Sequence, residues 1–434
     1  MFTAPRYIAI DDDPEELAPL VQALHDIGAP CVGIRFDPLG LPGPRLFDGV
    51  RVMFTDLHLV QGAASANQHY DAIARLLHTC VPAEHGPYLL VLWTSHEEER
   101  QALIERLQLL LEPDKMPIAL LAMGKEHFRN GANWDGPALQ KALRDHITAV
   151  PQIGALLSWE QDVLAAANAT LALVGGLLPA ADRTLDAYAG GMDGVLSLLA
   201  TTAVGDRSAR DDPRGAVASA LAPLLADRIV NQRDRHGTAE LWRRAVTFQA
   251  GGGALDENQK ATMHRMVHFA VPPAEPVTRT DWGAVIPFGP PQLTDDAMEA
   301  RYGVTAAQLR GKEFKLKANS IDAGRLVLIR GGAACDQAQN NPGPLPMLLG
   351  LLAPTSALQT GSRSPAVHAC PERLLLAGDG ESSTLLVSAR FTSTLIAADL
   401  VAWPDPMLRI REQLLMAILV HSATHAIRPG TLRF

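Results

Sequence analysis

The stretch Tyr7-Ile8-Ala9-Ile10-Asp11-Asp12-Asp13-Pro14 is a short apolar run that ends in three consecutive carboxylates and then changes to a helical pattern. The apolar part has the length of a buried β-strand, and a proline directly after an aspartate is typical of a helix start. Clustered carboxylates repel one another and raise each other's pKa. We therefore expect the acids at this strand end to bind a ligand.

Further apolar runs along the chain end in polar residues of different kinds. They are Val50–Thr55 before Asp56, Tyr88–Trp93 before Thr94, and Pro117–Gly124 before Lys125, with Cys31–Phe36 as an additional strand. Buried parallel strands have continuous apolar sequences, and the ligand site of an open α/β sheet lies at their carboxyl ends. The pattern predicts that two aspartate positions, a threonine and a lysine converge on one crevice.

As a set, these residues resemble the receiver domain of two-component response regulators. The resemblance implies that Asp11 and Asp12 bind Mg²⁺ together with Asp56, which would also be the phosphoacceptor. It implies that Thr94 is the switch hydroxyl and that Lys125 contacts the phosphoryl group.

The chemistry of phosphoryl transfer accounts for these residue types. Mg²⁺ takes oxygen ligands in octahedral geometry and keeps several waters, so two or three carboxylates suit it. Asp56 would attack a phosphoryl group in line and form an acyl phosphate. The metal ion, the lysine and the threonine hydroxyl would then neutralise charge on the equatorial oxygens.

The chain also departs from the receiver pattern. Lys125 is followed by Glu126 instead of proline, and Ala122 stands where an aromatic switch residue is usual. His58 and His96 follow the phosphoacceptor and the threonine by two residues, at positions that tune the lifetime of the phosphoryl group in the family. The alternative is that both are solvated loop histidines.

The resemblance implies an α/β class with a flavodoxin-like, doubly wound, five-stranded parallel sheet over residues 1–132. Apolar spacing predicts its helices at Glu15–Ile27, Ala64–Cys80 and Glu97–Leu111. Residues 37–49, where a receiver has its second helix, are rich in Pro and Gly and are expected to be irregular.

Residues 133–250 are expected to form a helical connector or an oligomerisation surface, because they are rich in Ala and Leu with helical periodicity. We predict four to six helices, broken at Gly175-Gly176, Gly190-Gly191 and Asp211-Asp212-Pro213. His146 and His236 are the candidates for a phosphotransfer histidine. Neither has a supporting motif, which favours surface histidines.

Residues 251–434 are expected to form an α+β output domain. The predicted elements are strands at 284–288, 325–330, 373–377 and 384–394, a hairpin turn at Gly378-Asp379-Gly380, and a terminal helix at Leu408–Ala423. The Cys-Asp-x-Ala-Gln element that begins at Cys335 is similar to one in uncharacterised bacterial proteins with a receiver-like N-terminus, as is the C-terminal Ile427-Arg428-Pro429-Gly430. That resemblance implies no reaction.

Two features of this region suggest other functions. Cys335 beside Asp336 after a Gly-rich turn could be a nucleophile, and the alternative is a buried cysteine with Asp336 as helix N-cap. Residues 294–312 could form a helix-turn-helix, but Asp295 and Glu299 repel DNA, which favours a surface helical hairpin.

Composition excludes several classes of protein. The net charge of -9 and the pI near 5.9 argue against blanket phosphate-backbone binding. Four scattered cysteines imply neither a disulfide framework nor a metal-ligand pair. The longest apolar segment, Val163–Pro179, is interrupted by polar residues and glycines. We expect a cytoplasmic protein without a membrane span.

Three functional hypotheses remain open. The first is a bacterial signalling protein whose Asp56 accepts a phosphoryl group with Mg²⁺ from a cognate histidine kinase or phosphotransfer protein, and whose receiver regulates the C-terminal domain. The second is a pseudo-receiver scaffold that binds a partner without phosphorylation, and the third is a C-terminal enzyme centred on Cys335 and Asp336. DNA is not an expected partner, and a homo-oligomer is compatible with the sequence.

Overall fold

The computed structural model describes residues 5–82, 86–131, 133–183, 185–232, 237–248, 253, 255–339, 343–361, 363–376 and 380–427. The chain divides into two compact units, Met1–Glu160 with Asp234–Thr247, and Gln161–Arg233 with Phe248–Phe434. Residues of the segment 133–250 therefore belong to both units.

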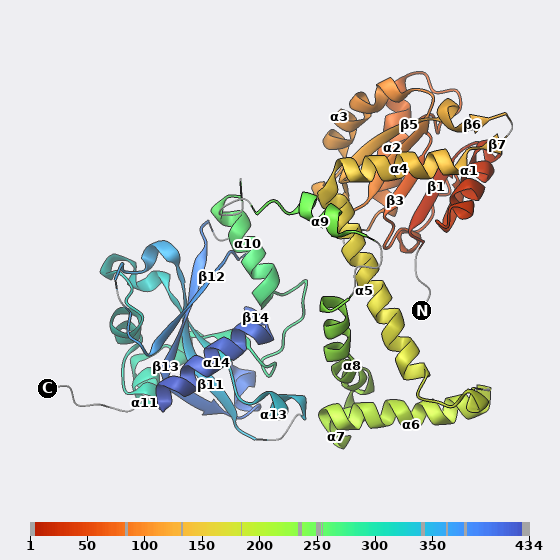
Figure 1. The fold of residues 1–434 in the computed structure, drawn as a ribbon. Coiled ribbons are helices and arrows are strands. Elements are labelled where there is room, and N and C mark those ends of the chain that lie inside the picture. The colour runs from red at the N-terminus through yellow and green to blue at the C-terminus, as the bar shows by residue number, and fades with distance from the viewer. Residues whose placement is uncertain are drawn as a thin grey trace. The chain divides into compact units, whose positions relative to one another are not determined.

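The first unit is built on a five-stranded sheet in the order β2-β1-β3-β4-β5, in which every pair of neighbours is parallel (Figure 1). Its strands are β1 (Tyr7–Asp11), β2 (Cys31–Arg35), β3 (Val52–Thr55), β4 (Leu89–Thr94) and β5 (Ala119–Gly124). The predicted α/β class with a five-stranded parallel sheet is confirmed. Continuous apolar sequence identified β1, β3, β4 and β5 because both faces of the sheet are covered there, whereas the edge strand β2 is mostly exposed.

Helices cover the two faces of this sheet. Helices α1 (Pro14–Asp26) and α4 (Gly136–Ala149) pack through Leu20, Leu24 and Leu139 into the core on one face. Helices α2 (Ala66–Cys80) and α3 (Arg100–Leu110) pack through Ile73, Leu77 and Leu103 into the core on the other. The sheet is therefore doubly wound.

The segment 37–49 is irregular, as predicted. Its regular structure is a single 3₁₀ turn, η1 (Pro44–Leu46), and Phe47 directly after it is 1% exposed in the core. Cys80 at the end of α2 donates to the Pro42 carbonyl, at 3.2 Å from the sulfur. A buried aromatic thus anchors this irregular segment in the core.

Further short elements connect these strands and helices. They are η2 (Glu97–Glu99) before α3, η3 (Pro113–Lys115) before β5, η4 (Lys125–Phe128) after β5, and the two-stranded ribbon β6 (Arg129–Asn130) and β7 (Asn133–Trp134). The turns η2 and η4 follow β4 and β5, so they lie at the carboxyl edge of the sheet.

Beyond α4 the chain is helical, within the predicted range of four to six helices. The helices are α5 (Pro151–Gly175), α6 (Leu185–Val204), α7 (Asp206–Asp211), α8 (Pro213–Val230) and α9 (Ala239–Ala245), with the 3₁₀ turn η5 (Ala180–Asp182). The Asp212 side chain accepts from the Gly215 amide and caps α8, which confirms the predicted break before Pro213. His236 and the side chain of His146 lie outside the described part of the chain.

The predicted break at Gly190-Gly191 is wrong, because α6 runs through both glycines. A β-carbon at Gly191 would lie 2.8 Å from the Leu178 side chain, so the missing side chain makes room for packing. Glycine is tolerated inside a helix where a packing contact offsets its cost in conformational entropy.

The second unit contains a seven-stranded antiparallel sheet in the order β12-β13-β11-β10-β9-β14-β8. The strands are β8 (Phe269–Ala270), β9 (Ala284–Pro287), β10 (Arg325–Arg330), β11 (Leu345–Pro354), β12 (Val367–Leu374), β13 (Ser383–Leu395) and β14 (Leu408–Ile410). The sequence did not predict β11, although it pairs with both β10 and β13. Its Pro346, Gly350 and Pro354 are residue types that are typical of loops. The glycine lies where the pairing register shifts, as at a β-bulge.

The end of the chain also differs from the expectation. Leu408–Ile410 is strand β14 and the terminal helix α14 begins only at Glu412 and ends at Ala426, because the backbone of Leu408 and Arg409 pairs with β9. Residues 378–379 of the expected hairpin turn and residues 428–430 of the C-terminal motif lie outside the described residues.

The remaining elements of this unit are short apart from its first helix. They are α10 (Glu257–His268), η7 (Pro290–Gln292), α11 (Asp295–Tyr302), α12 (Ala306–Gln308), the π-helix η8 (Leu309–Glu313), η9 (Ala318–Ala323), α13 (Ala334–Ala338), η10 (Thr355–Ala357) and η11 (Asp399–Ala402). A three-residue α12 that continues as a π-helix with buried Leu309 and Glu313 does not present the exposed face of a DNA-recognition helix. Within the residues described, no helix has both the length and the apolar character needed to cross a membrane.

Candidate functional site

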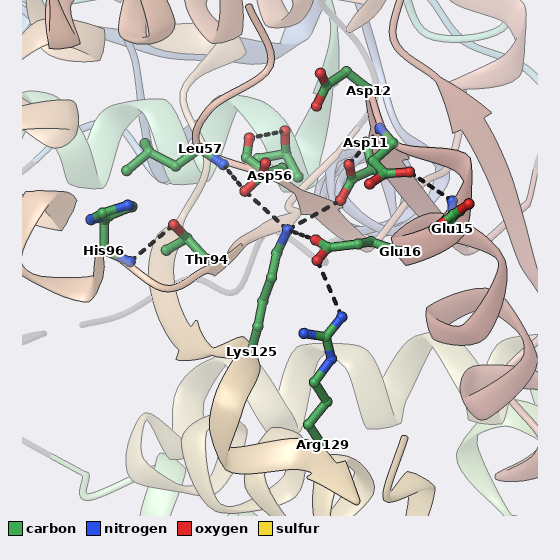
Figure 2. Close-up of polar contacts among 12 residues, drawn as sticks. Asp11, Asp12, Glu15, Glu16, Asp56, Leu57, Thr94, His96, Lys125 and Arg129 are labelled. Carbon is green, nitrogen blue, oxygen red and sulfur yellow. Dashed lines mark hydrogen bonds and ion pairs between the residues drawn. The ribbon is translucent and has the colours of Figure 1, made fainter. Parts of the chain in front are cut away.

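The carboxyl edge of the parallel sheet brings Asp11, Asp56 and Lys125 together (Figure 2). Asp11 ends β1, Asp56 follows β3, and Lys125 follows β5. The Asp56 amide donates to the Ile10 carbonyl at 3.0 Å, which fixes the two acid-bearing strand ends side by side. Parallel pairing thus places residues that are distant in sequence at one edge.

Lys125 is the cation at the centre of this site. Its Nζ lies 3.4 Å from Asp11 Oδ2 and 3.3 Å from Asp56 Oδ1, and its side chain is 8% exposed. The ammonium also donates to a Glu16 carboxylate oxygen. One buried ammonium therefore contacts three carboxylates.

Glu16 belongs to this site, although sequence reasoning did not identify it. It lies in the first turn of α1, where Glu is common because it suits the helix dipole, and this ordinary role concealed it. Its second oxygen lies 3.4 Å from a guanidinium nitrogen of Arg129. The sequence feature that could have identified Glu16 is its position one helical turn after the aspartates.

Asp12 completes an all-oxygen cluster. One carboxylate oxygen from each of Asp11, Asp12 and Asp56 lies within 4.8 Å of the others. Gln61 donates to Asp12 at 3.2 Å, whereas the Asp13 carboxylate accepts from the Glu15 amide and caps α1. A set of hard carboxylate oxygens partly removed from water fits Mg²⁺, which these residues would hold.

The burial of the site changes the protonation of its groups. The pKa of Asp11 is raised to about 6 overall: burial raises it most, Lys125 and an amide hydrogen bond lower it, and Asp56 and Glu16 add smaller increases. Burial also lowers the pKa of Lys125, but the attraction of Asp56, Glu16 and Asp11 outweighs this effect, so its pKa is raised overall. The lysine is therefore charged at neutral pH, and Asp11 binds a proton at a higher pH than an ordinary aspartate does.

Thr94 lies one strand away from the acids. It ends β4, is 1% exposed, and pairs in register with Gly124, the residue before Lys125. Its hydroxyl accepts the His96 amide hydrogen bond at 3.1 Å (Figure 2). The structure thus places Thr94 at the same sheet edge, with its hydroxyl oriented by the loop after β4.

Gly124 is the point where the loops after β4 and β5 meet. A β-carbon there would lie 2.2 Å from Glu97 Oε1 and 3.1 Å from His127 Nδ1. Glu97 Oε1 and His127 Nδ1 lie 3.6 Å from each other across it. The two loops are therefore linked only because residue 124 has no side chain.

His58 and His96 are not isolated loop histidines. Their rings stack with centroids 4.5 Å apart, and His69 from α2 stacks on the other face of His58 at 4.3 Å. Burial, followed by the neighbouring His58, lowers the pKa of His69. Both side chains remain partly solvated in their loops, and their stacking shows that the loops after β3 and β4 approach each other here.

Cys335 is exposed, so the alternative of a buried cysteine is wrong. The N-cap of α13 is Ala333, without a side-chain hydrogen bond, so Asp336 does not cap the helix. The helix follows the Gly331-Gly332 turn, and its N-cap lies three residues before Asp336, the N-cap of the alternative.

Comparisons of the chain with family models, with curated proteins and with solved structures give no match. The function proposed below therefore depends on the geometry of the site.

Proposed function

We propose that the first unit is a receiver domain that accepts a phosphoryl group on Asp56 and thereby regulates the second unit. The observation that carries this proposal is the position of Lys125 Nζ, 3.4 Å from Asp11 and 3.3 Å from Asp56 at the carboxyl edge of the sheet. A nucleophilic carboxylate, a buried cation and additional acids are the groups that phosphoryl transfer requires.

Asp56 is held in a state suited to attack. Among the described residues, its hydrogen bond from the Leu57 amide at 2.8 Å and its ion pair with Lys125 both involve Oδ1. Oδ2 is therefore the oxygen that bonds to phosphorus. The bond between phosphorus and the donor, such as a phosphohistidine nitrogen, breaks at the same time, and the donor ring takes the electron pair.

The surrounding residues stabilise the transferred group. Lys125 would neutralise charge on the phosphoryl oxygens, and Glu16 holds its ammonium within reach of them. When bound to Asp11, Asp12 and Asp56, Mg²⁺ would balance the excess negative charge of these carboxylates.

The proposed donor is a cognate histidine kinase or phosphotransfer protein, and the proposed location is the cytoplasm. A pseudo-receiver scaffold is the second candidate. It is favoured by the contact of Lys125 with Glu16 and by the hydrogen bond that the Thr94 hydroxyl already accepts, since both groups have partners in the absence of a phosphoryl group.

Intact-mass measurement of the full chain with acetyl phosphate and Mg²⁺ tests the proposal. We expect the wild type to gain one phosphoryl group and Asp56→Asn to gain none. Lys125→Ala should lose the modification, and Asp48→Asn, an exposed aspartate of the same unit, should behave as the wild type. A wild type that gains no mass and shows no response to beryllium fluoride favours the scaffold.

A further inference from the structure

A second cluster of ligand-type side chains lies beside the acid pocket. We call it the histidine–glutamate turn, comprising His58 from the loop after β3, and His96, Glu98 and Glu99 from the loop after β4. His96 Nδ1 lies 3.5 Å from Glu98 Oε1, and His58 Nε2 lies 3.6 Å from Glu99 Oε1. The loop after β3 thus contributes one imidazole, and the loop after β4 contributes a second imidazole and two carboxylates.

The ligand atoms of this turn are already gathered. One ligand atom each from His96, Glu98 and Glu99 lies within 4.8 Å of the others. Glu99 is fixed by a hydrogen bond of 2.7 Å from the Tyr70 hydroxyl to its other oxygen, and His58 is fixed by stacking between His69 and His96. Groups outside the turn therefore orient its ligands, as a second shell does around a metal ion.

The separations suit a shared metal ion. Two ligand atoms that bind one tetrahedral Zn²⁺ at about 2.0–2.1 Å lie about 3.4 Å from each other. The distances of 3.5 Å and 3.6 Å between imidazole nitrogen and carboxylate oxygen are close to that value.

We propose that the histidine–glutamate turn binds one divalent transition-metal ion of the Zn²⁺ class. His96, Glu98 and Glu99 supply three ligands, a solvent molecule completes the coordination, and the His58 imidazole lies beside the site with its Nε2 3.6 Å from Glu99 Oε1. A mixed nitrogen and oxygen set selects such ions, whereas the acid pocket has oxygen ligands alone. The two sites are therefore chemically distinct, and this site does not depend on phosphorylation of Asp56.

Metal titration of the full chain, freed of tags and stripped with a chelator, tests the proposal. Zn²⁺ and Co²⁺ are added in the presence of saturating Mg²⁺, which occupies oxygen-only sites. We expect one equivalent to bind, with the visible absorption of a four-coordinate site for Co²⁺. His96→Ala and Glu98→Gln should each weaken binding by at least about 100-fold, since even second-shell changes cost 10–100-fold.

The matched control is His78→Ala. His78 forms an exposed pair with Glu112 at 3.0 Å on the same unit, so its loss removes an equivalent histidine–glutamate contact elsewhere. We expect this variant to bind Zn²⁺ as the wild type does. His96 and Glu98 are exposed, so both test variants should keep the wild-type circular dichroism spectrum.

Three outcomes would overturn the proposal. The first is unchanged Zn²⁺ affinity in His96→Ala and Glu98→Gln. The second is binding that is lost in an Asp11→Asn, Asp56→Asn double variant but kept in His96→Ala, which would place the ion in the acid pocket. The third is binding that is lost only in His421→Ala, which would place it in the second unit beside His368, whose ring centroid lies 5.1 Å from that of His421.

Discussion

The two edges of the parallel sheet are built from the same two strands but carry opposite kinds of charge. Arg6 and Arg51 directly precede β1 and β3, whereas Asp11 and Asp56 stand at or directly after their carboxyl ends. At the amino edge, both arginines contact Glu160 of α5, at 2.6 Å and 2.7 Å. At that edge a carboxylate from the chain itself therefore contacts both cations.

The carboxyl edge is not completed in this way. Four carboxylates, those of Asp11, Asp12, Glu16 and Asp56, gather around two cations, Lys125 and Arg129, which leaves an excess of two negative charges. At the amino edge two arginines meet one glutamate, and Arg51 makes a two-pronged contact with it. The comparison teaches that a charge cluster short of partners identifies the edge where a ligand is expected.

Removal of Lys125 should have the largest effect on this contrast. Lys125→Ala leaves carboxylates buried without their cation, which costs about 3–5 kcal/mol of unfolding free energy. Millimolar Mg²⁺ should restore part of it. Hydrogen exchange of the β1 and β3 amides in the full chain measures this stability. Arg129→Ala, whose side chain is 45% exposed, is the control and should cost less than about 1 kcal/mol. A Lys125→Ala variant with the unfolding free energy of the wild type would contradict the excess of negative charge at this edge.

Mg²⁺ should stabilise the wild type by a smaller amount. A ligand that binds only the folded state at 100 times its Kd adds about 2.7 kcal/mol. Asp12→Asn should remove most of this increment, and Glu160→Gln, at the opposite edge, should keep it. The same exchange measurement with and without Mg²⁺ provides the comparison. Equal increments in Asp12→Asn and the wild type would exclude the acid cluster as the metal site.

Glu160→Gln should cost about 1–2 kcal/mol, because its arginines lose charge-assisted hydrogen bonds. Burial alone would raise the pKa of Glu160, but hydrogen bonds from Arg51 and Arg6 outweigh it, so the pKa is lowered overall. The contribution is therefore complete above the ordinary glutamate pKa of about 4.3 and is lost as the pH falls through the lower folded value. Wild type and Glu160→Gln should converge in stability at the acid end of a pH series. A constant difference down to that end would show that the charge does not matter.

The smallest expected effect is coupling from Asp56 to the loop after β4. If the Thr94 hydroxyl turns to a phosphoryl mimic, the His96 amide loses its acceptor and the acidic turn Glu97–Glu99 shifts. We expect a few-fold change in hydrogen exchange within residues 94–107 on addition of beryllium fluoride, below about 1 kcal/mol. A change confined to residues 125–130 would show that coupling follows the loop after β5 instead.

The sequence predicted the parallel sheet because each of its buried strands is a continuous apolar run that ends in a polar residue. It also brought Asp11, Asp56 and Lys125 to one edge, since parallel strands align their carboxyl ends. It did not predict β11, whose Pro346 and Gly350 are typical loop residues; Gly350 lies at the register shift against β13, which a local pattern does not reveal.

Glu16 and the stacked histidines show a second limit. Glu16 looks like an ordinary helix-start acid, and only the tertiary structure reveals that it reaches Lys125. His69 lies on a helix whose apolar spacing gives no hint of its contact with His58. Side chains that act across elements carry no local signal, because periodicity reports only the face that a residue occupies.

At Gly124 the loops after β4 and β5 meet because the residue carries a hydrogen atom in place of a side chain. A methyl group there would displace the flexible Glu97 carboxylate and part it from His127, without altering any charge or any strand of the sheet. Gly124→Ala should therefore separate Glu97 from His127, and so weaken the contact between the two loops, while the acids and the lysine keep their positions.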